Sequence, residues 1–312
     1  MIEIYKKYPQ FSFLKNLGDK SMKVIISIPA YNEEKTIDKV VQEINEVMCS
    51  TNYKYEIIVI DDGSKDKTVE IAKNAGAKVY SNKINLGLAE TFKHEIQRCK
   101  EHKADIIVHT DADGQYPAIF IPQLIKKIEE GYDLVLGSRF GRGKYSGSMT
   151  KSMGNIAFAK LFSRLLNAKL TDTTTGFRAF TNRVAELPLI NTFTYTQEQL
   201  IRAGKAKMRI GEISIKTRKT RPSRLFSGPL NYALKAWINI FRIYRDFEPL
   251  KFFGIIGLTL FTPGFLIGLY FILLHFTVGI SGHTGLLFLM LILLSTGLQI
   301  MLFGFLADMS RK

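Results

Sequence analysis

The sequence predicts an α/β domain built on a mostly parallel sheet, followed by two apolar membrane-spanning helices. Three observations predict this fold class. Short apolar runs alternate with helical patterns over the first half of the chain, and polar residues that include acids follow several of those runs. The residues from Phe252 to Ala307 include no Asp, Glu, Lys or Arg. Alternating strands and helices are typical of a parallel sheet, and long uncharged runs are typical of membrane spans.

The elements of the α/β domain can be assigned in chain order from these patterns. The continuous apolar runs are typical of strands buried on both faces of a sheet. The predicted strands are Val24–Ala30, Glu56–Ile60, Lys78–Ser81, Asp105–Thr110 and Asp133–Ser138. The predicted helices between them are Glu34–Met48, a helix capped by Asp66 that ends at Ala75, Ala89–Cys99 and Pro117–Glu130.

The apolar tail contains two uncharged runs, Phe252–Phe276 and Leu286–Ala307. As helices they would be about 37 Å and 33 Å long, which exceeds the roughly 30 Å of a bilayer's hydrocarbon core. A short uncharged linker joins them, so we expect a membrane hairpin with spans at about 252–276 and 286–307. The alternative is a pair of buried helices in a soluble core, which rarely supplies two such runs so close together.

Basic residues flank both ends of the expected hairpin. They are Arg242, Arg245 and Lys251 on one side, and Arg311 and Lys312 on the other. The positive-inside rule therefore places both ends in the cytoplasm. The first ten residues, MIEIYKKYPQ, do not form a signal peptide, so we expect the bulk of the protein to stay on the cytoplasmic side as well.

A helical apolar pattern over Pro229–Asp246 precedes the hairpin, with Trp237 as a membrane-interface anchor. A helix lying in the membrane surface is expected here; a core-packed helix is the alternative. The predicted domains are therefore a cytoplasmic domain over 1–226, an interfacial amphipathic helix over 227–248 and the hairpin over 249–312.

Composition restricts the function classes. The net charge of +15, with 46% hydrophobic and 23% charged residues, excludes a disordered chain. The two cysteines, Cys49 and Cys99, are too few for a disulfide scaffold or a cysteine-based structural zinc site. The positive charge predicts an anionic partner, which is nucleic acid, a membrane surface or a phosphorylated substrate.

Acidic residues gather where the predicted strands end. Glu33 follows the first strand, Asp61 and Asp62 the second, and Asp111 and Asp113 the Asp105–Thr110 strand, while Arg139 follows the last of them. The carboxyl ends of parallel strands share one edge of a sheet, which is where ligands bind in such folds. Neither a dinucleotide-binding glycine motif nor a P-loop occurs, so those nucleotide sites are excluded.

The D-x-D pattern of Asp111 and Asp113 predicts a divalent metal site. Two carboxylates one residue apart, with Gln115 as a neutral oxygen ligand, suit Mg²⁺ or Mn²⁺ shared with a diphosphate. The alternative is a pair of turn-capping aspartates. Asp61 or Asp62 can accept hydrogen bonds from a base or a ribose.

Several motifs in this order resemble the family-two inverting glycosyltransferases of the GT-A fold. They are PAYNEE (29–34), VIDDGSKDKT (59–68), NLGLAETF (85–92), TDADGQYP (110–117) and GSRF (137–140). The later DTTTGFRAF (172–180) and the C-terminal hairpin make the chain similar to the polyprenyl-phosphate and dolichyl-phosphate glycosyltransferases. The motifs cover about residues 22–226.

The resemblance implies a role for each matching residue. The nucleotide-sugar site would comprise Pro29, Tyr31, Glu33, Asp61, Asp62, Asp111, Ala112, Asp113 and Arg218. The metal would be held by Asp111, Asp113 and Gln115, and the acceptor phosphate would contact Arg139, Lys151, Arg221 and Arg224. Catalytic roles fall to Asp113, Arg139 and Asp172. Asp172 would orient the acceptor or act as a weak base; its alternative is a turn-capping aspartate.

The implied reaction moves one sugar from a GDP- or UDP-linked donor to polyprenyl or dolichyl phosphate, for glycan or glycoprotein assembly. A phosphate acceptor is already an oxyanion near pH 7, so no strong general base is required. The basic run Lys216–Arg224 would grip donor and lipid phosphates, or it would only attract anionic headgroups. The alternatives are a glycan-extending polysaccharide synthase and a non-enzymatic basic membrane scaffold. Nucleic acid is not expected as a partner, since the acids would weaken its binding.

Overall fold

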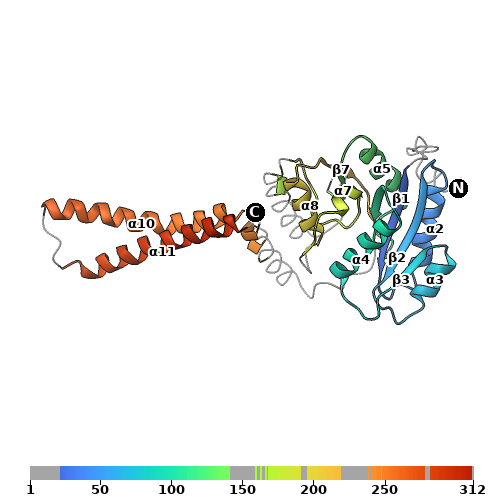
Figure 1. Cartoon of the computed structure of the whole chain (residues 1–312), viewed down its shortest axis with the longest axis horizontal. Helices are drawn as coiled ribbons and strands as arrows, with labels where there is room; N and C mark the ends of the chain where they lie inside the picture. The colour runs from blue at the N-terminus through green and yellow to red at the C-terminus, as the bar shows by residue number, and fades with distance from the viewer. Residues whose placement is uncertain are drawn as a thin grey trace. The chain divides into compact units, whose positions relative to one another are not determined.

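The computed structural model divides the chain into two compact units, Met1–Pro229 and Leu230–Lys312, each described by itself below (Figure 1). The residues that the structure describes are 22–140, 159, 162–163, 166, 168–190, 195–218, 238, 241–242, 244–246, 248–277 and 282–310.

The first unit is an α/β domain. Its strands are β1 (Lys23–Ala30), β2 (Lys54–Asp61), β3 (Lys78–Ser81), β4 (Ile106–His109), β5 (Leu134–Ser138), β6 (Arg178–Thr181) and β7 (Ile210–Ser214). Its helices are α2 (Ile37–Met48), α3 (Thr68–Asn74), α4 (Leu88–Glu101), the 3₁₀ turn η2 (Ala118–Phe120), α5 (Ile121–Glu129), α7 (Asn182–Ala185) and α8 (Tyr195–Lys205).

The strands form one seven-stranded sheet in the order β3-β2-β1-β4-β6-β5-β7. Strands β1 to β4 pair in parallel, and β5 pairs in parallel with β7. Only β6, among the described strands, runs antiparallel, and it separates β4 from β5. The predicted α/β fold class with a mostly parallel sheet is confirmed.

Helices cover both faces of the sheet (Figure 1). On one face, Val24, Ile26 and Ile28 of β1 pack in a buried cluster with residues of α2 and α5. The intervening side chains of β1 point to the other face, where Ser27 hydrogen-bonds Glu95 of α4. Burial on both faces explains why the strands are continuous apolar runs rather than alternating ones.

The predicted strands lie within a few residues of the observed ones, but β6 and β7 were not among them. Strand β6 begins with a charged residue, Arg178, which is fully buried. Strand β7 lies in the basic stretch of the sequence and is only partly buried. Neither strand has the uninterrupted apolar run that marks β1, β2, β4 and β5.

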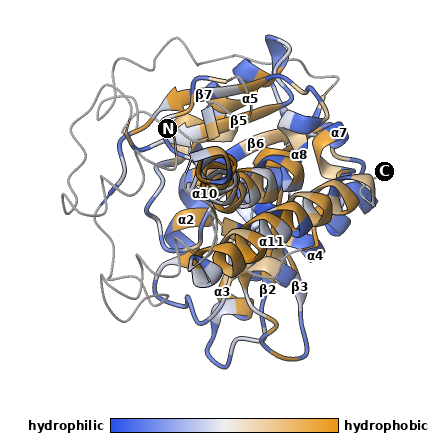
Figure 2. Ribbon diagram, turned by 90° about the vertical axis from the view of Figure 1, so that its left-hand side faces the viewer, coloured by the Kyte–Doolittle hydropathy of each residue, from blue (hydrophilic) through white to orange (hydrophobic). Residues whose placement is uncertain are grey.

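The second unit is a pair of long helices, α10 (Pro249–Thr277) and α11 (Thr284–Met309). Both are long and apolar enough to cross a membrane (Figure 2), and few of their residues are buried within the structure. They approach closely because glycines face each other: a Cβ added to Gly297 would lie 2.7 Å from the main-chain nitrogen of Phe261 and 2.8 Å from the carbonyl oxygen of Gly257. Small residues at helix contacts are typical of membrane helix pairs.

The predicted interfacial helix is only partly covered by the structure. The described residues Ile238, Phe241, Arg242, Tyr244, Arg245 and Asp246 are helical. The anchor Trp237 and residues 227–237 lie outside the described part of the chain, so the predicted surface helix stays a prediction.

Candidate active site at the edge of the sheet

One edge of the sheet collects every predicted site residue that the structure describes, apart from Arg218. The parallel strands β1, β2, β4 and β5 all end at this edge. Because β6 runs the other way, it begins there, with Arg178 opposite both His109 of β4 and Leu136 of β5. The segment that precedes β6, which carries Asp172, is therefore delivered to the same edge as the carboxyl ends.

The loops after β1 and β2 hold each other in place. The main-chain N–H of Asn32 donates to the Ser64 hydroxyl at 2.8 Å, and the Asn32 side-chain oxygen accepts from the N–H of Lys65 at 2.8 Å. The N–H of Glu33 donates to the Thr68 hydroxyl at 2.8 Å. Pro29, Tyr31 and Glu33 are thus fixed beside the end of β2, and the ring of Tyr31 is exposed.

Asp61 and Asp62 are both buried, but they differ in their contacts. Asp62 accepts three hydrogen bonds, from the side chain of Asn82 at 3.0 Å and from the N–H groups of Leu86 and Gly87 at 2.9 Å. It therefore holds the loop between β3 and α4. Asp61 accepts one bond, from the N–H of Ser64 at 3.1 Å. Of the two predicted nucleotide contacts, Asp61 has the greater remaining capacity to accept bonds from a ligand.

The turn after β2 requires a glycine at position 63. Its φ is +75°, and an added Cβ would lie 2.8 Å from the carbonyl carbon of Ile84. The loop after β2 consequently packs directly on the backbone of the loop that Asp62 holds.

The loop after β4 carries the predicted metal ligands. The Asp111 side chain keeps 33% of its surface exposed. The atoms packed around it nevertheless raise the pKa of its carboxyl to about 6; His109 opposes this shift and the nearby charge of Asp113 adds to it. Asp113 accepts a bond from the N–H of Gln115 at 2.9 Å. Two neighbouring carboxylates, one of them resisting ionisation, form a site that a cation would stabilise.

The donor set fits a divalent cation of the Mg²⁺ or Mn²⁺ type. Asp111, Asp113 and Gln115 offer oxygen atoms, which these ions prefer. Gly176 lies against Asp111, and a Cβ there would come within 3.1 Å of a carboxylate oxygen. A glycine at this point therefore leaves room beside the Asp111 carboxylate. Among the described residues no group of three or more His, Cys, Asp or Glu side chains could hold a metal ion, so the proposed donor set rests on two carboxylates and the amide oxygen of Gln115.

A buried polar cluster behind Asp111 was not predicted. His109 Nδ1 lies 2.8 Å from Glu95 Oε2, and Ser27 bonds the same carboxylate. His109 Nε2 has no hydrogen-bond partner in the described structure and lies 3.9 Å from Asp111 Oδ1. A histidine at the end of an otherwise apolar strand was the only sequence signal for it.

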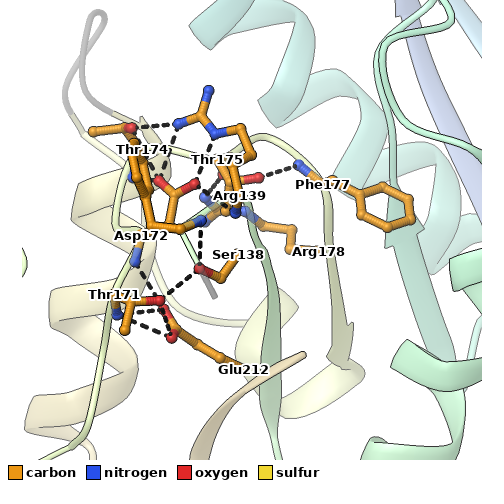
Figure 3. Close-up of polar contacts among 10 residues, drawn as sticks. Ser138, Arg139, Thr171, Asp172, Thr174, Thr175, Phe177, Arg178 and Glu212 are labelled. Atoms are coloured by element: carbon orange, nitrogen blue, oxygen red, sulfur yellow. Dashed lines mark hydrogen bonds and ion pairs between the residues drawn. The ribbon is translucent and has the colours of Figure 1, made fainter. Parts of the chain in front are cut away.

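Arg139 and Asp172 form a two-pronged ion pair at the end of β5 (Figure 3). Arg139 Nε and Nη2 donate to the two Asp172 oxygens at 2.7 and 3.0 Å, and Nη2 also donates to the Thr174 hydroxyl at 2.7 Å. Burial alone would raise the pKa of the Asp172 carboxyl, but the hydrogen bonds and charge of Arg139 outweigh it, so the pKa lies below its ordinary value. Asp172 is therefore ionised at neutral pH.

Arg178 is the largest fully buried side chain of the described structure. Its guanidinium donates to the carbonyl oxygens of Thr196 and Thr175 and to the side-chain oxygen of Gln199, and burial lowers its pKa to about 10. These bonds tie the Asp172 loop to α8. These contacts of Arg178 are structural.

The basic segment after β7 enters the site region through Arg218. Its N–H donates to the carbonyl oxygen of Gln115 at 2.9 Å, which places its main chain beside the metal loop. Its guanidinium is paired with both oxygens of Glu43, at 2.6 and 2.7 Å. The predicted acceptor contacts Lys151, Arg221 and Arg224 lie outside the described residues.

The sequence comparisons identify the family of this chain. Residues 25–187 match the family described as Glycosyl transferase family 2. A dolichyl-phosphate hexose transferase of Haloferax volcanii is 32% identical over 190 residues, which cover 61% of this chain and 80% of that protein. A dolichol-phosphate mannosyltransferase of Pyrococcus furiosus is 29% identical over 264 residues, which cover 78% of this chain and 72% of that protein.

Among solved structures, glucosyl-3-phosphoglycerate synthase from Mycobacterium tuberculosis, in complex with Mn²⁺, UDP and phosphoglyceric acid, is similar with a TM-score of 0.56. The match covers 72% of this chain and 78% of that one at 22% identity, so it bears on the fold alone. The α/β unit thus resembles the GT-A glycosyltransferase fold. With the family match spanning just over half of its residues, the chain belongs to glycosyl transferase family 2 and is a glycosyltransferase.

Proposed function

We propose that this protein transfers a single sugar, with inversion, from a nucleotide diphosphate sugar to a polyprenyl or dolichyl phosphate. The observation that carries the proposal is the division of the sheet edge into two kinds of site. One carries the carboxylates Asp111 and Asp113, and the other carries an arginine held by a buried carboxylate. The names of the two relatives above, which include dolichyl or dolichol phosphate, support this acceptor class.

The donor would occupy the ends of β1, β2 and β4. Asp61 would accept hydrogen bonds from the base or ribose, and Pro29, Tyr31 and Glu33 would surround the nucleoside. Asp111, Asp113 and Gln115 would hold a Mg²⁺ or Mn²⁺ ion, which when bound supplies positive charge to the departing diphosphate. The bound Mn²⁺ and UDP named for the mycobacterial synthase support a dication and a nucleotide in this fold.

The acceptor phosphate would bind at Arg139. A guanidinium suits this task because it offers several donors in a planar array that matches phosphate oxygens. The phosphate monoester is itself the nucleophile, since its second pKa is about 6. Asp172 is engaged by Arg139 and has a lowered pKa, which makes it a poor proton acceptor. We therefore assign Asp172 to orienting the acceptor site, rather than to general-base catalysis.

The two apolar helices would anchor the enzyme in the membrane that holds its lipid substrate. The basic residues at both ends of the hairpin favour a cytoplasmic location for the catalytic domain and both termini. Few residues of α10 and α11 are buried within the structure, which supports lipid as their surroundings.

The experiment is transfer of radiolabelled sugar to the lipid fraction by the full-length protein in membranes. Each UDP- and GDP-linked sugar is supplied with undecaprenyl or dolichyl phosphate and Mn²⁺ or Mg²⁺. The proposal expects a lipid product that carries one sugar and requires the metal. A product lengthened to a polymer would support a polysaccharide synthase instead. No transfer with any donor would refute the proposal.

A further inference from the structure

Glu212 is an acidic residue in a basic stretch of the chain, on the edge strand β7. It pairs with Leu136 of β5. Leu136 precedes Ser138 by two residues and Arg139 by three. Glu212 is half-buried, and this burial raises the pKa of its carboxyl group. An acid in such a position costs stability unless hydrogen-bond donors compensate for the lost water.

The donors come from the segment that carries Asp172. The N–H of Thr171 lies 2.9 Å from both Glu212 oxygens, the Thr171 hydroxyl lies 2.9 Å from one of them, and the N–H of Asp172 lies 3.0 Å from the other. Figure 3 shows these contacts below the ion pair of Arg139. Glu212 thus fixes the main chain at the residue whose side chain holds Arg139.

The direction of the hydrogen bonds can be assigned. The Thr171 hydroxyl has one proton, which it donates to Glu212, so the Ser138 hydroxyl, 2.5 Å away, donates to Thr171. Ser138 in turn accepts from the N–H of Phe140 at 3.2 Å. The chain of donors that begins beside Arg139 ends at the Glu212 carboxylate, which can only accept. A side chain that carries a hydrogen-bond donor at position 212 would oppose this direction of the hydrogen bonds.

The contacts close a ring around Arg139. Strand β5 leads to Ser138 and Arg139, these bond Thr171 and Asp172, those residues bond Glu212, and β7 pairs back to β5. Asp172 also accepts from the main-chain N–H of Arg139 at 3.2 Å, which leaves the arginine little freedom to turn. Displacement of the Thr171–Asp172 segment would therefore turn the guanidinium.

We propose that Glu212 is a positioning residue, which sets the orientation of Arg139 toward the acceptor phosphate through Thr171 and Asp172. This inference rests on the proposed function, because it assumes that Arg139 contacts the acceptor. Glu212 does not reach the substrate itself. Substitution of Glu212 should therefore raise the KM for the acceptor, and this rise should depend on the presence of Arg139.

The test compares Glu212→Gln with Glu186→Gln, a control that removes one exposed carboxylate from the same domain. Full-length enzymes are assayed in detergent with undecaprenyl phosphate and the donor that the wild type uses. Loss of well-placed charged hydrogen bonds to a phosphate weakens its binding by about tenfold or more, so a rise of about tenfold in the KM for undecaprenyl phosphate is expected for Glu212→Gln. The donor KM should stay within about twofold, and Glu186→Gln should match the wild type.

A double-variant cycle separates positioning from general damage. In the Arg139→Ala background, Glu212→Gln should change the acceptor KM by less than about twofold, because the group that it positions is gone. Binding of UDP and GDP with Mn²⁺, measured by calorimetry, should be the same for Glu212→Gln and the wild type, which shows that the variant is folded.

Three outcomes would overturn the inference. Glu212→Gln could behave like Glu186→Gln, its effect could persist undiminished without Arg139, or nucleotide binding could weaken as much as acceptor binding. If the wild type transfers no sugar to undecaprenyl or dolichyl phosphate, the proposed function fails first, and this inference falls with it. The wild-type assay therefore distinguishes the two failures.

Discussion

The two halves of the sheet edge are built differently. The donor half consists of the loops after β1, β2 and β4, each a parallel strand followed by a helix, and main-chain and side-chain bonds such as those of Asn32 connect them. The acceptor half depends on the antiparallel strand β6 and the edge strand β7, and ionised side chains hold it together. In the donor half the predicted metal ligands Asp111 and Asp113 are neighbouring carboxylates, whereas in the acceptor half Asp172 is paired with Arg139.

This difference has a chemical meaning. Carboxylates that resist ionisation, such as Asp111, suit a site that is completed by a cation and a diphosphate. An arginine whose orientation is fixed by a buried carboxylate suits recognition of a phosphate, because little conformational entropy is lost when the ligand binds. Substitutions on the two sides should therefore change different quantities.

The largest effect is expected for Asp113→Ala in the donor half. Loss of a metal ligand removes several kcal/mol of transition-state stabilisation, so the transfer rate should fall by about a thousandfold or more. The rate is measured over a range of Mn²⁺ concentrations, with Asp38→Ala on α2 as the control. Full activity with unchanged metal dependence would show that the metal site lies elsewhere.

A smaller effect, on stability, is expected for Asp172→Asn in the acceptor half. Removal of one partner from this buried pair should lower the free energy of unfolding by about 3 kcal/mol at pH 7. Because the folded pKa of Asp172 is lowered, its stabilisation is present above the ordinary value of 3.8 and is lost as the pH falls through the folded pKa.

Thermal unfolding of the wild type and Asp172→Asn between pH 7 and pH values below about 4 measures this contribution. The difference in Tm should be constant at neutral pH and should shrink in the acid range. A difference that grows as the pH falls would contradict the assignment of Asp172 as an ionised partner of Arg139.

The smallest effect is expected for Gly63→Ala in the donor half. The left-handed φ costs about 1–2 kcal/mol for a residue with a side chain, and the added methyl group would displace Ile84. Nucleotide affinity should fall by about fivefold, which calorimetry with UDP or GDP would detect. Gly76→Ala is the matched control: its φ is +95°, but its Cβ would meet no atom closer than 3.9 Å. Equal affinities of the two variants would exclude coupling between this turn and the nucleotide site.

The donor half could be predicted from the sequence more completely than the acceptor half. Strands buried on both faces have continuous apolar sequences, which can be recognised directly. The acids that follow them lie at the same edge of the sheet because parallel strands end at one edge. Asp61, Asp111 and Asp113 accordingly lie at the ends of parallel strands that share one edge of the sheet. The sequence does not say that Asp62 bonds the loop before α4, because that contact depends on the path of the loop.

The acceptor half depends on contacts that no local pattern reveals. Strand β6 begins with the buried Arg178, and a charged residue is a poor signal for a buried strand. Glu212 lies among basic residues, where a solvated surface is the ordinary interpretation. The pairing of Arg139 with Asp172 joins residues 33 positions apart and requires the antiparallel insertion of β6. The two apolar helices, by contrast, follow from composition alone.

Calorimetric titration of UDP or GDP, with Mn²⁺, into full-length Arg139→Ala tests most directly whether the two halves of the site have separate tasks. Arg139→Ala should bind the nucleotide within about twofold of the wild type, although loss of charged hydrogen bonds to phosphate should lower its transfer to undecaprenyl phosphate by at least about tenfold. Asp113→Ala, titrated in parallel, should lose metal-dependent nucleotide binding. If Arg139→Ala lost nucleotide affinity as fully as Asp113→Ala, the division into a donor half and an acceptor half would be wrong.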